Sequence, residues 1–448
     1  LAGFGGNRRI KRSFDAPVVR KIEPAPGGVV EGGRWLGVGN GFSRTSAGRS
    51  DGGGAGYEGG RRREDPRLEL GVVERSPGIG RVTLHLNSLG TAEARRGYRE
   101  HLSGYFRAHR GDLDEDSLRL FVAERVTHAL ATQQVDIGEV MPVHLSPPAT
   151  RRRIAVRSAW AGKQFQLGFS TEKSHRIIDL RQCDVVTPEL FALLKPLRSL
   201  LEPRLNRARQ VQIKLAMVDQ GVDVLIENWI ANDLDTHETL SEFAKTYGLA
   251  RLSLDEGYGP VPFYEPEPVT VTLGGVAVGY QPYGFLQATL DGEAALVQAV
   301  NDIIGEDSIV ADLFAGSGTF ALSMGAGRKI YAGEADLQAS LALKAAAGRS
   351  GRTIFAEHRD LFRRPLSPEE LNRFQTVVLD PPRAGAKEQV ANLAASTVPS
   401  IAYVSCNPAS FARDAKTLVA AGYRLQRIWP VGQFRWSTHI ELVGHFSR

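Results

Sequence analysis

From about residue 285 to the C-terminus, short apolar runs alternate with segments of helical character, and this rhythm constrains the fold more than any other feature. The apolar runs are IVADLF, KIYAGE, TVVLD and IAYVS, at 309–314, 329–334, 376–380 and 401–405. Strands that alternate with helices, such as the helix we expect over 337–347, predict a parallel, doubly wound α/β sheet. The segments 423–431 and 439–447 are typical of an antiparallel pair that closes the sheet.

The middle of the chain follows another pattern, in which helices accompany antiparallel hairpins. Residues 118–131 and 187–201 carry apolar positions at helical spacing, and the second run begins with a favourable Thr-Pro pair. Residues 151–170 and 211–228 each alternate like two strands around a turn. This pattern predicts an α+β unit rich in antiparallel sheet.

The first part of the chain differs from both. It holds glycine clusters such as DGGGAGYEGG, followed by three arginines, and this composition buries too little apolar surface to offset chain entropy. We expect a poorly ordered or degenerate segment there; the alternative is a flexible RNA-binding tail. The expected units are therefore residues 1–116, a central α+β RNA-recognition unit over 117–284 and a catalytic unit over 285–448.

Charge and cysteine content bound the class of protein. The formal net charge of +5 permits a polyanionic partner such as RNA without requiring one. Two cysteines, Cys183 and Cys406, are too few for a disulfide framework or a four-cysteine metal site. No apolar run reaches the length of a membrane span, so we expect a cytoplasmic protein with no metal and no membrane partner.

The first motif is DLFAGSGTFAL at 312–322, where a strand should end in a glycine turn that a helix follows at once. Gly316 and Gly318 would let the backbone turn tightly against a nucleotide-like ligand. Glu334 ends the next strand, where an acid can accept hydrogen bonds from ribose hydroxyls. The alternatives are an ordinary tight turn and a solvated loop acid.

Two further motifs follow later strands. LDPPRAGA at 379–386 places Asp380 before a stiff proline turn, and VSCNPASFARD at 404–414 places Cys406 directly after an apolar strand. Because ligands of such sheets collect beyond the carboxyl ends of the strands, both residues should share one rim with Glu334. By themselves, an Asp-Pro-Pro can be a simple strand end and a cysteine a small buried apolar residue.

The last motif is FRWSTHIELVGHF at 434–446, in which His439 and Glu441 alternate with apolar residues. A carboxylate on such a strand can serve as a general base beside a thiol. In isolation, Glu441 is typical of a surface strand residue.

These motifs together resemble the RNA uracil-5-methyltransferases, a family that modifies ribosomal RNA or the T-loop of transfer RNA. The resemblance runs from about Phe121 to the C-terminus and is most specific in DLFAGSGTF, LDPPRAGA, VSCNPASFARD and the closing HIE. GFLQAT at 284–289 is similar to the segment that opens the family's catalytic domain. The resemblance implies a Rossmann-like class I methyltransferase fold and S-adenosyl-L-methionine as the cofactor.

The resemblance also implies residue roles. Cys406 falls on the nucleophile and Glu441 on the general base. The cofactor-binding positions it implies are Gln287, Phe314, Gly316, Thr319, Glu334, Asp360 and Asp380. Three residues of the central unit are candidates for RNA contact, with a solvated basic sheet face as the alternative reading: Arg151, Arg153 and His175.

The implied chemistry needs these residue types. Carbon 5 of uracil is a poor nucleophile, and attack of a thiolate on carbon 6 makes it reactive; a base must then remove the proton from carbon 5. The uridine would have to be turned out of its stack to reach them.

The chain departs from many ribosomal members, which carry an OB-like domain and a four-cysteine iron–sulfur site before the central unit. No cysteine precedes residue 117, so we expect no iron–sulfur cluster. We expect a monomer that acts on 23S ribosomal RNA rather than transfer RNA. The competing classes are a non-catalytic RNA-binding relative and a methyltransferase for DNA or small molecules, and the implied nucleophilic cysteine argues against most of the latter.

Overall fold

The computed structural model describes residues 115–170, 177–206, 210–231, 233–435 and 439–448, together with the backbone of five short N-terminal strands. Those strands are β1 (Arg20–Ile22), β2 (Val29–Glu31), β3 (Arg34–Leu36), β4 (Val73–Ser76) and β5 (Ile79–Leu84). They pair as β1-β5-β4 and β2-β3. The expectation of poor order over residues 1–116 otherwise lies outside the described residues.

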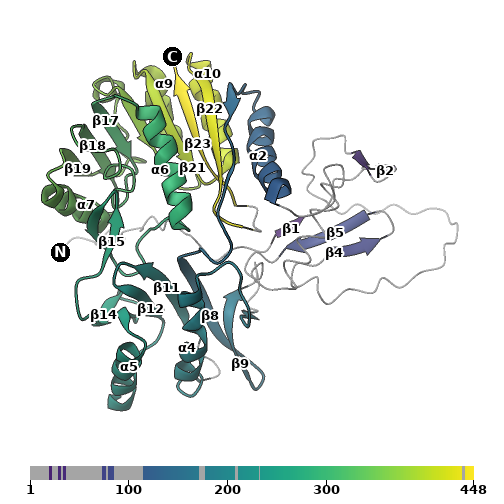
Figure 1. The fold of residues 1–448 in the computed structure, drawn as a ribbon, viewed down its shortest axis with the longest axis vertical. Coiled ribbons are helices and arrows are strands. Elements are labelled where there is room, and N and C mark those ends of the chain that lie inside the picture. The colour runs from purple at the N-terminus through teal and green to yellow at the C-terminus, as the bar shows by residue number, and fades with distance from the viewer. Residues whose placement is uncertain are drawn as a thin grey trace, which may run out of the picture.

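The C-terminal half forms the predicted doubly wound sheet (Figure 1), whose strands run in the order β19-β18-β17-β20-β21-β23-β22-β6. Its strands are β6 (Glu139–Val140), β7 (His144–Leu145), β17 (Ile309–Leu313), β18 (Lys329–Glu334), β19 (Ile354–His358), β20 (Thr376–Leu379), β21 (Ser400–Ser405), β22 (Arg424–Gly432) and β23 (Glu441–Ser447). Strands β17 to β21 are parallel, whereas β23 runs antiparallel to both β21 and β22. The Rossmann-like α/β fold and its antiparallel closing pair are thus confirmed.

Helices cover both faces of this sheet, which explains why its central strands are apolar along their whole length. The helices are α2 (Glu115–Thr132), α6 (Leu290–Ile304), α7 (Leu337–Ser350), α8 (Pro368–Leu371), α9 (Lys387–Ala395) and α10 (Pro408–Ala420). Side chains just before four of them accept backbone N–H groups of the first turn: Thr289 at α6, Asp336 at α7, Ser367 at α8 and Asn407 at α10.

One expectation about this sheet is wrong. We expected a helix immediately after the glycine turn of the first motif, but residues 316–323 form successive turns instead. Gly316 and Gly318 have φ angles of 58° and 100°, which a right-handed helix cannot accommodate. The chain therefore reaches β18 without a regular helix, and the amide of Gly316 turns toward Glu334.

The middle of the chain forms a second sheet in the order β10-β9-β8-β11-β12-β13-β14. Its strands are β8 (Arg153–Ala161), β9 (Gln164–Ser170), β10 (Ile177–Asp179), β11 (Gln212–Val218), β12 (Gly221–Glu227), β13 (Leu249–Asp255) and β14 (Val261–Tyr264). Both predicted hairpins, β8–β9 and β11–β12, are present. The helices α3 (Pro188–Ala192), α4 (Leu194–Leu201) and α5 (Leu234–Thr246) contribute apolar residues to the core of this sheet.

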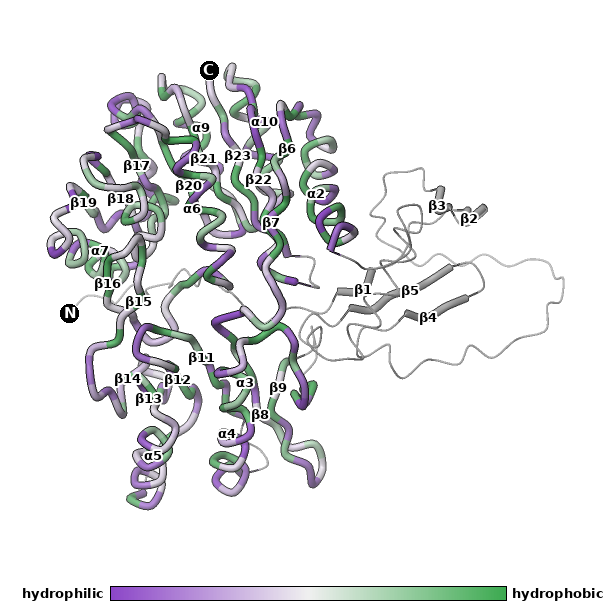
Figure 2. The backbone as a smooth tube through the Cα atoms, viewed as in Figure 1, coloured by the Kyte–Doolittle hydropathy of each residue, from purple (hydrophilic) through white to green (hydrophobic). Residues whose placement is uncertain are grey.

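Residues buried on α5 recur at helical spacing: Thr236, Leu240, Phe243 and Ala244. Figure 2 shows the same helix with hydrophilic and hydrophobic residues alternating along its turns. One face therefore packs on the sheet and the other faces solvent.

The expected boundaries of the central unit, 117 and 284, do not separate the two sheets in space. Strands β6 and β7 pair with β22 of the C-terminal sheet, and α2 packs on α10 and β22. The hairpin of β15 (Thr270–Leu273) and β16 (Val276–Gly279) packs on α7. The C-terminal unit therefore takes up chain on both sides of the central sheet, because apolar residues of α2 such as Val126 and Leu130 complete its core.

Candidate active site

Four strands of the C-terminal sheet end on the same rim, and a residue singled out from the sequence lies at the end of each strand or directly after it. Phe314, Asp380 and Cys406 come directly after β17, β20 and β21, and Glu334 is the last residue of β18. The chain order reverses at β17, since β18 lies on one side of it and β20 on the other. In open α/β sheets this is the crevice where ligands bind.

The backbone of the first motif is bent by left-handed residues. Phe314, which is not glycine, has φ 65°, and its ring lies 5.3 Å from that of Phe362. Gly318 has φ 100°, which favours glycine, and a Cβ atom there would lie 2.4 Å from Leu343 Cδ1 on α7. Thr319 is half-buried at the same turn, and its carbonyl oxygen accepts a hydrogen bond from the Ser323 hydroxyl. Residues 314–316 and 318 of this turn are buried, and its two glycines leave the backbone there without side-chain atoms.

Glu334 is held in one orientation by two backbone amides. Its carboxylate accepts hydrogen bonds from the N–H groups of Gly316 and Asp336, each at 2.8 Å. The side chain is buried at the carboxyl end of β18. This placement, beside the glycine turn, suits an acceptor for the ribose hydroxyls of a nucleoside.

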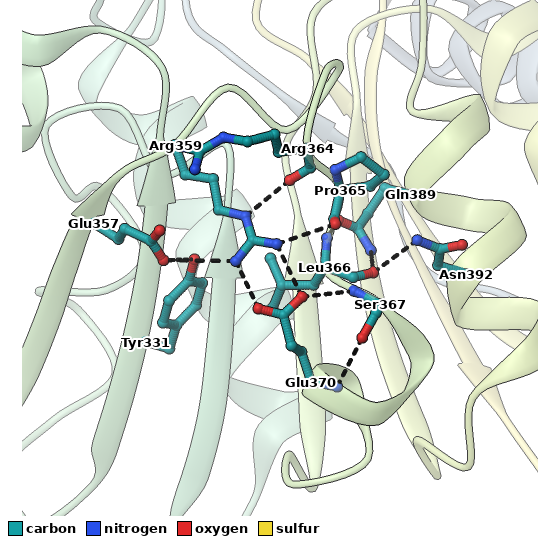
Figure 3. Close-up of polar contacts among 10 residues, drawn as sticks. All are labelled: Tyr331, Glu357, Arg359, Arg364, Pro365, Leu366, Ser367, Glu370, Gln389 and Asn392. Atoms are coloured by element: carbon teal, nitrogen blue, oxygen red, sulfur yellow. Dashed lines mark hydrogen bonds and ion pairs between the residues drawn. The ribbon is translucent and has the colours of Figure 1, made fainter.

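Asp360 lies on the loop after β19, and a neighbouring arginine organises that loop (Figure 3). The guanidinium of Arg359 donates to the carbonyl oxygens of Arg364 and Pro365, at 2.8 and 3.1 Å, and to both carboxylate oxygens of Glu370 on α8. The Asp360 carboxylate accepts from the N–H groups of Phe362 and Arg363 inside the loop. The loop therefore carries Asp360 and the ring of Phe362 to the crevice as a fixed unit.

Gln287 lies on the segment that leads from the central sheet into α6. Its side chain is buried and its amide oxygen accepts a hydrogen bond from Gln433 Nε2 at 2.9 Å. Its backbone carbonyl accepts from Arg152 Nε at 3.0 Å. Contacts from both sheets therefore hold this residue in place.

Cys406 occupies the single residue between β21 and the N-cap of α10. The next residue, Asn407, caps α10 and also donates from Nδ2 to the carbonyl oxygen of Arg383 at 2.9 Å. The cysteine loop is therefore tied to the proline turn that carries Asp380. A position just before a helix N-terminus favours a thiolate.

A second tie between these loops passes through Asp414 on α10. Its buried carboxylate accepts hydrogen bonds from the Ala386 N–H at 2.9 Å and the Tyr403 hydroxyl at 2.6 Å. Its neighbour Arg413 donates to the carbonyl oxygen of Ala384 at 2.9 Å. The last residues of VSCNPASFARD thus position the second motif.

Glu441 begins β23 beside Cys406 and is buried. Burial, reinforced by the nearby charge of Asp380, raises the pKa of Glu441 to about 8. A hydrogen bond from Gln433 and the charge of Arg383 act in the opposite direction on that pKa.

The thiol of Cys406 responds to the same charges. Burial raises the pKa of Cys406 well above its ordinary value, and the carboxylates of Glu441 and Asp380 raise it further. The guanidinium of Arg383 lowers that pKa. A thiol, a buried carboxyl group with a pKa near neutrality and a cation therefore meet at one rim, which is an arrangement suited to covalent and proton-transfer chemistry.

The three candidates for RNA contact differ in their surroundings. Arg151 is half-buried, with its guanidinium 5.5 Å from the Phe434 ring. Arg153 is only 5% exposed; its guanidinium lies 4.3 Å from the Tyr283 ring, and Nη1 donates to the carbonyl oxygen of Leu286. His175 lies outside the described residues. Of the two that are described, Arg151 is the more exposed.

Sequence reasoning missed residues that act on the site through other residues. The chief ones are Arg359, Arg383, Asp414 and Gln433. Arg383 and Asp414 lie inside motifs already recognised, which was the available signal. Nothing in the local pattern marks Gln433, because its partners are distant in sequence.

Among the described helices, none has both the length and the apolar content that crossing a bilayer requires. Within the same residues, no group of three or more His, Cys, Asp or Glu side chains is arranged to hold a metal ion.

Comparisons with known proteins identify relatives of this chain. A family model described as tRNA (Uracil-5-)-methyltransferase matches residues 353–447. An uncharacterized RNA methyltransferase of Zymomonas mobilis is 47% identical over 335 residues, which span 75% of this chain and 84% of the relative. The 23S rRNA (uracil(1939)-C(5))-methyltransferase RlmD of Erwinia tasmaniensis is 29% identical, over 73% of this chain and 76% of its own.

Among solved structures, the tRNA (uracil-54, C5)-methyltransferase of Pyrococcus abyssi, in complex with S-adenosyl-L-homocysteine, has a similar fold. Its TM-score is 0.59 at 22% sequence identity, and the match covers 75% of this chain and 83% of that one. The likeness concerns the arrangement of the sheets.

Proposed function

Because the chain belongs to the RNA (uracil-5-)-methyltransferase family, we propose that it methylates carbon 5 of a uridine in RNA through a covalent adduct between Cys406 and carbon 6. The observation that carries this proposal is the meeting of Cys406, Glu441 and Asp380 within electrostatic range of one another at the carboxyl ends of the strands. Methyl transfer to nitrogen or oxygen would need no such thiol.

The proposed cofactor is S-adenosyl-L-methionine, which when bound supplies an electrophilic methyl group. The residues of the crevice fit a nucleoside cofactor of this kind. Glu334 is a fixed acceptor at the end of β18, and the crowding at Gly318 keeps side-chain bulk out of the turn. The residues that would hold the cofactor are Gln287, Phe314, Gly316, Thr319, Glu334, Asp360 and Asp380.

In the proposed mechanism the Cys406 thiolate attacks carbon 6 of the uracil ring, and a covalent S–C bond forms. The electrons of the ring's double bond move toward the carbonyl group, which makes carbon 5 nucleophilic. After carbon 5 has been methylated, Glu441 accepts the proton from that carbon. The S–C bond then breaks, the ring double bond returns and the thiolate leaves.

The assigned roles require particular protonation states. Burial and two carboxyl groups raise the pKa of Cys406 and thereby favour the protonated thiol. The thiol must therefore lose its proton before it can attack carbon 6. Arg383 and the N-terminus of α10 are the groups of this chain that favour the thiolate. Glu441 acts as a base only when it is ionised, so its raised pKa matches proton uptake near neutral pH.

RNA containing 5-fluorouridine tests the covalent mechanism, because fluorine at carbon 5 cannot leave as a proton. We expect the wild-type protein with cofactor to form an adduct that survives denaturing electrophoresis. The Cys406→Ala variant should form none while it binds S-adenosylhomocysteine with nearly unchanged affinity, since the thiol is assigned to the base. An adduct formed by that variant would refute the role of Cys406. RNA binding without any adduct from the wild type would favour a non-catalytic RNA-binding protein.

For the target we favour ribosomal RNA over transfer RNA. The support is the relative that acts on 23S rRNA and aligns with 73% of this chain. The central sheet would be the RNA-recognition unit, with Arg151 beside the rim as a contact residue. Methylation assays on undermodified forms of both RNAs decide the matter, and product in transfer RNA alone would reverse the preference.

A further inference from the structure

Gln433 is a buried amide that has no place in the roles assigned so far. It directly follows β22, whose residue Val431 pairs with Glu441 on β23. The side chain is 2% exposed, although glutamine is mostly a surface residue. A buried amide is costly unless its donors and acceptor are satisfied, so the partners of Gln433 indicate why it is there.

The partners determine which way the amide points. Gln433 Oε1 accepts a hydrogen bond from the Ala288 N–H at 3.0 Å, which identifies the other end of the amide as the donor. Gln433 Nε2 donates to Gln287 Oε1 at 2.9 Å, and the amide lowers the pKa of the Glu441 carboxyl group. An NH₂ group has two N–H donors, so one remains for Glu441 after the bond to Gln287.

We propose that Gln433 is a positioning residue that couples the cofactor-binding side chain Gln287 to the general base Glu441. This inference rests on the proposed function, because both partners take their roles from it. With its oxygen engaged by Gln433, Gln287 offers its own N–H donors to a ligand. The same amide favours the ionised, proton-accepting form of Glu441, because it lowers the pKa of that carboxyl group.

The surrounding chain leaves this amide little freedom. At Gly292, in the first turn of α6, an added Cβ atom would lie 2.8 Å from Gln433 Cβ and 3.0 Å from Gln433 Oε1. The segment with Gln287 and Ala288 is fixed in turn by Arg152, which donates to the carbonyl oxygens of both residues. The packing at the junction of α6, β22 and β23 therefore fixes the position of the Gln433 side chain between Gln287 and Glu441.

The test is Gln433→Met, which keeps the length of the side chain and removes both donors and the acceptor. Two quantities are measured: the affinity for S-adenosylhomocysteine without RNA, and the rate at which the uridine adduct resolves as a function of pH. We expect about tenfold weaker binding, the effect of losing about one hydrogen bond. We also expect the midpoint of the pH profile to rise by about one unit, because the lost donor stabilised the ionised form of Glu441.

Gln220→Met is the matched control. The amide of Gln220 also accepts from one backbone N–H and donates to one oxygen, both of Thr270, at 2.9 Å each. The Gln220→Met variant should leave both the affinity for S-adenosylhomocysteine and the midpoint of the pH profile unchanged. Gln433→Glu is the second variant: it keeps the acceptor for Ala288, places another carboxyl group beside Glu441, and should raise the midpoint further.

A purely structural role for Gln433 would lower stability without moving the pH midpoint, and that result in both variants would overturn the inference. So would wild-type affinity combined with a wild-type profile. If the unaltered protein formed no adduct with 5-fluorouridine RNA, the proposed function itself would fail, and the two failures are therefore distinguishable.

Discussion

At the scale of single residues, the site combines groups that shift the pKa values of Cys406 and Glu441 in opposite directions. Burial and the charge of Asp380 raise the pKa values of both Cys406 and Glu441, whereas Arg383 lowers both. Two acids that influence each other titrate as a pair, so the assay has to separate their steps. Adduct formation reports the thiol, and adduct resolution reports the base.

We therefore predict that adduct resolution slows as the pH falls below about 8, the value to which burial raises the pKa of Glu441. The rate falls on the acid side because Glu441 accepts a proton only as a carboxylate and is protonated below its pKa. The rate of adduct resolution should fall about tenfold for each pH unit below that value. The measurement is the decay of the covalent RNA–protein complex in single-turnover, pH-jump experiments. In Glu441→Gln the adduct should accumulate at every pH, and unchanged turnover in that variant would remove Glu441 from the mechanism.

At the scale of elements, the loop between β19 and α8 shows how one side chain shapes a binding surface. Figure 3 shows the Arg359 guanidinium hydrogen-bonded to two carbonyl oxygens of the loop and to the Glu370 carboxylate. The bidentate pairing with Glu370 also lowers the pKa of that carboxyl group. Ser367 and Glu370 form a capping box at the start of α8, so the loop and the helix begin as one unit.

We predict that Arg359→Gln weakens binding of S-adenosylhomocysteine about tenfold, because the loop that carries Asp360 loses a charged anchor worth about 1.5–3 kcal/mol. Isothermal titration calorimetry measures the affinity. Arg364→Gln is a matched control, since the hydrogen bonds that this exposed residue makes within the loop come from its backbone: its N–H donates to the Asp360 carbonyl oxygen and its own carbonyl oxygen accepts from Arg359. Equal affinities for the two variants would show that the anchor does not act on the cofactor.

At the scale of the whole molecule, the two sheets share apolar core and a buried ion pair. Ala216 and Val218 of the central sheet belong to the same apolar cluster as residues of α6 and β17. Arg152, just before β8, pairs with Glu293 in the first turn of α6, and both side chains are buried. The segment with Gln287 runs through this junction, so the arrangement of the two units and the geometry of the site depend on each other.

We predict that Arg152→Met lowers the stability of the protein by about 3–5 kcal/mol, because it leaves the Glu293 carboxylate buried without its partner. The double variant Arg152→Met/Glu293→Leu should recover much of that loss. Thermal unfolding of both variants provides the measurement. Arg427→Met, which breaks an exposed pair with Glu139, should change the transition little. A comparable loss there would mean that burial is not the cause.

The sequence alone determined the class of the fold and the rim on which the site lies. Alternating apolar strands and helices require a parallel sheet, and parallel strands bring their carboxyl ends to one edge. Phe314, Glu334, Asp380 and Cys406 could therefore be placed together from their positions after strands. Local patterns suffice for this, because strand and helix periodicity act over a few residues.

Only the tertiary structure decided the features that depend on contacts between segments distant in the sequence. It assigned α2, β6 and β7 to the C-terminal sheet, because their apolar faces complete a core formed by residues about 300 positions away. It replaced the expected helix after β17 with a glycine turn. It also joined Gln433 to Gln287, 146 residues apart, and surrounded Cys406 with the charges that set its pKa. Hydrogen bonds and charges between distant segments depend on packing in three dimensions, and periodicity along the chain does not record them.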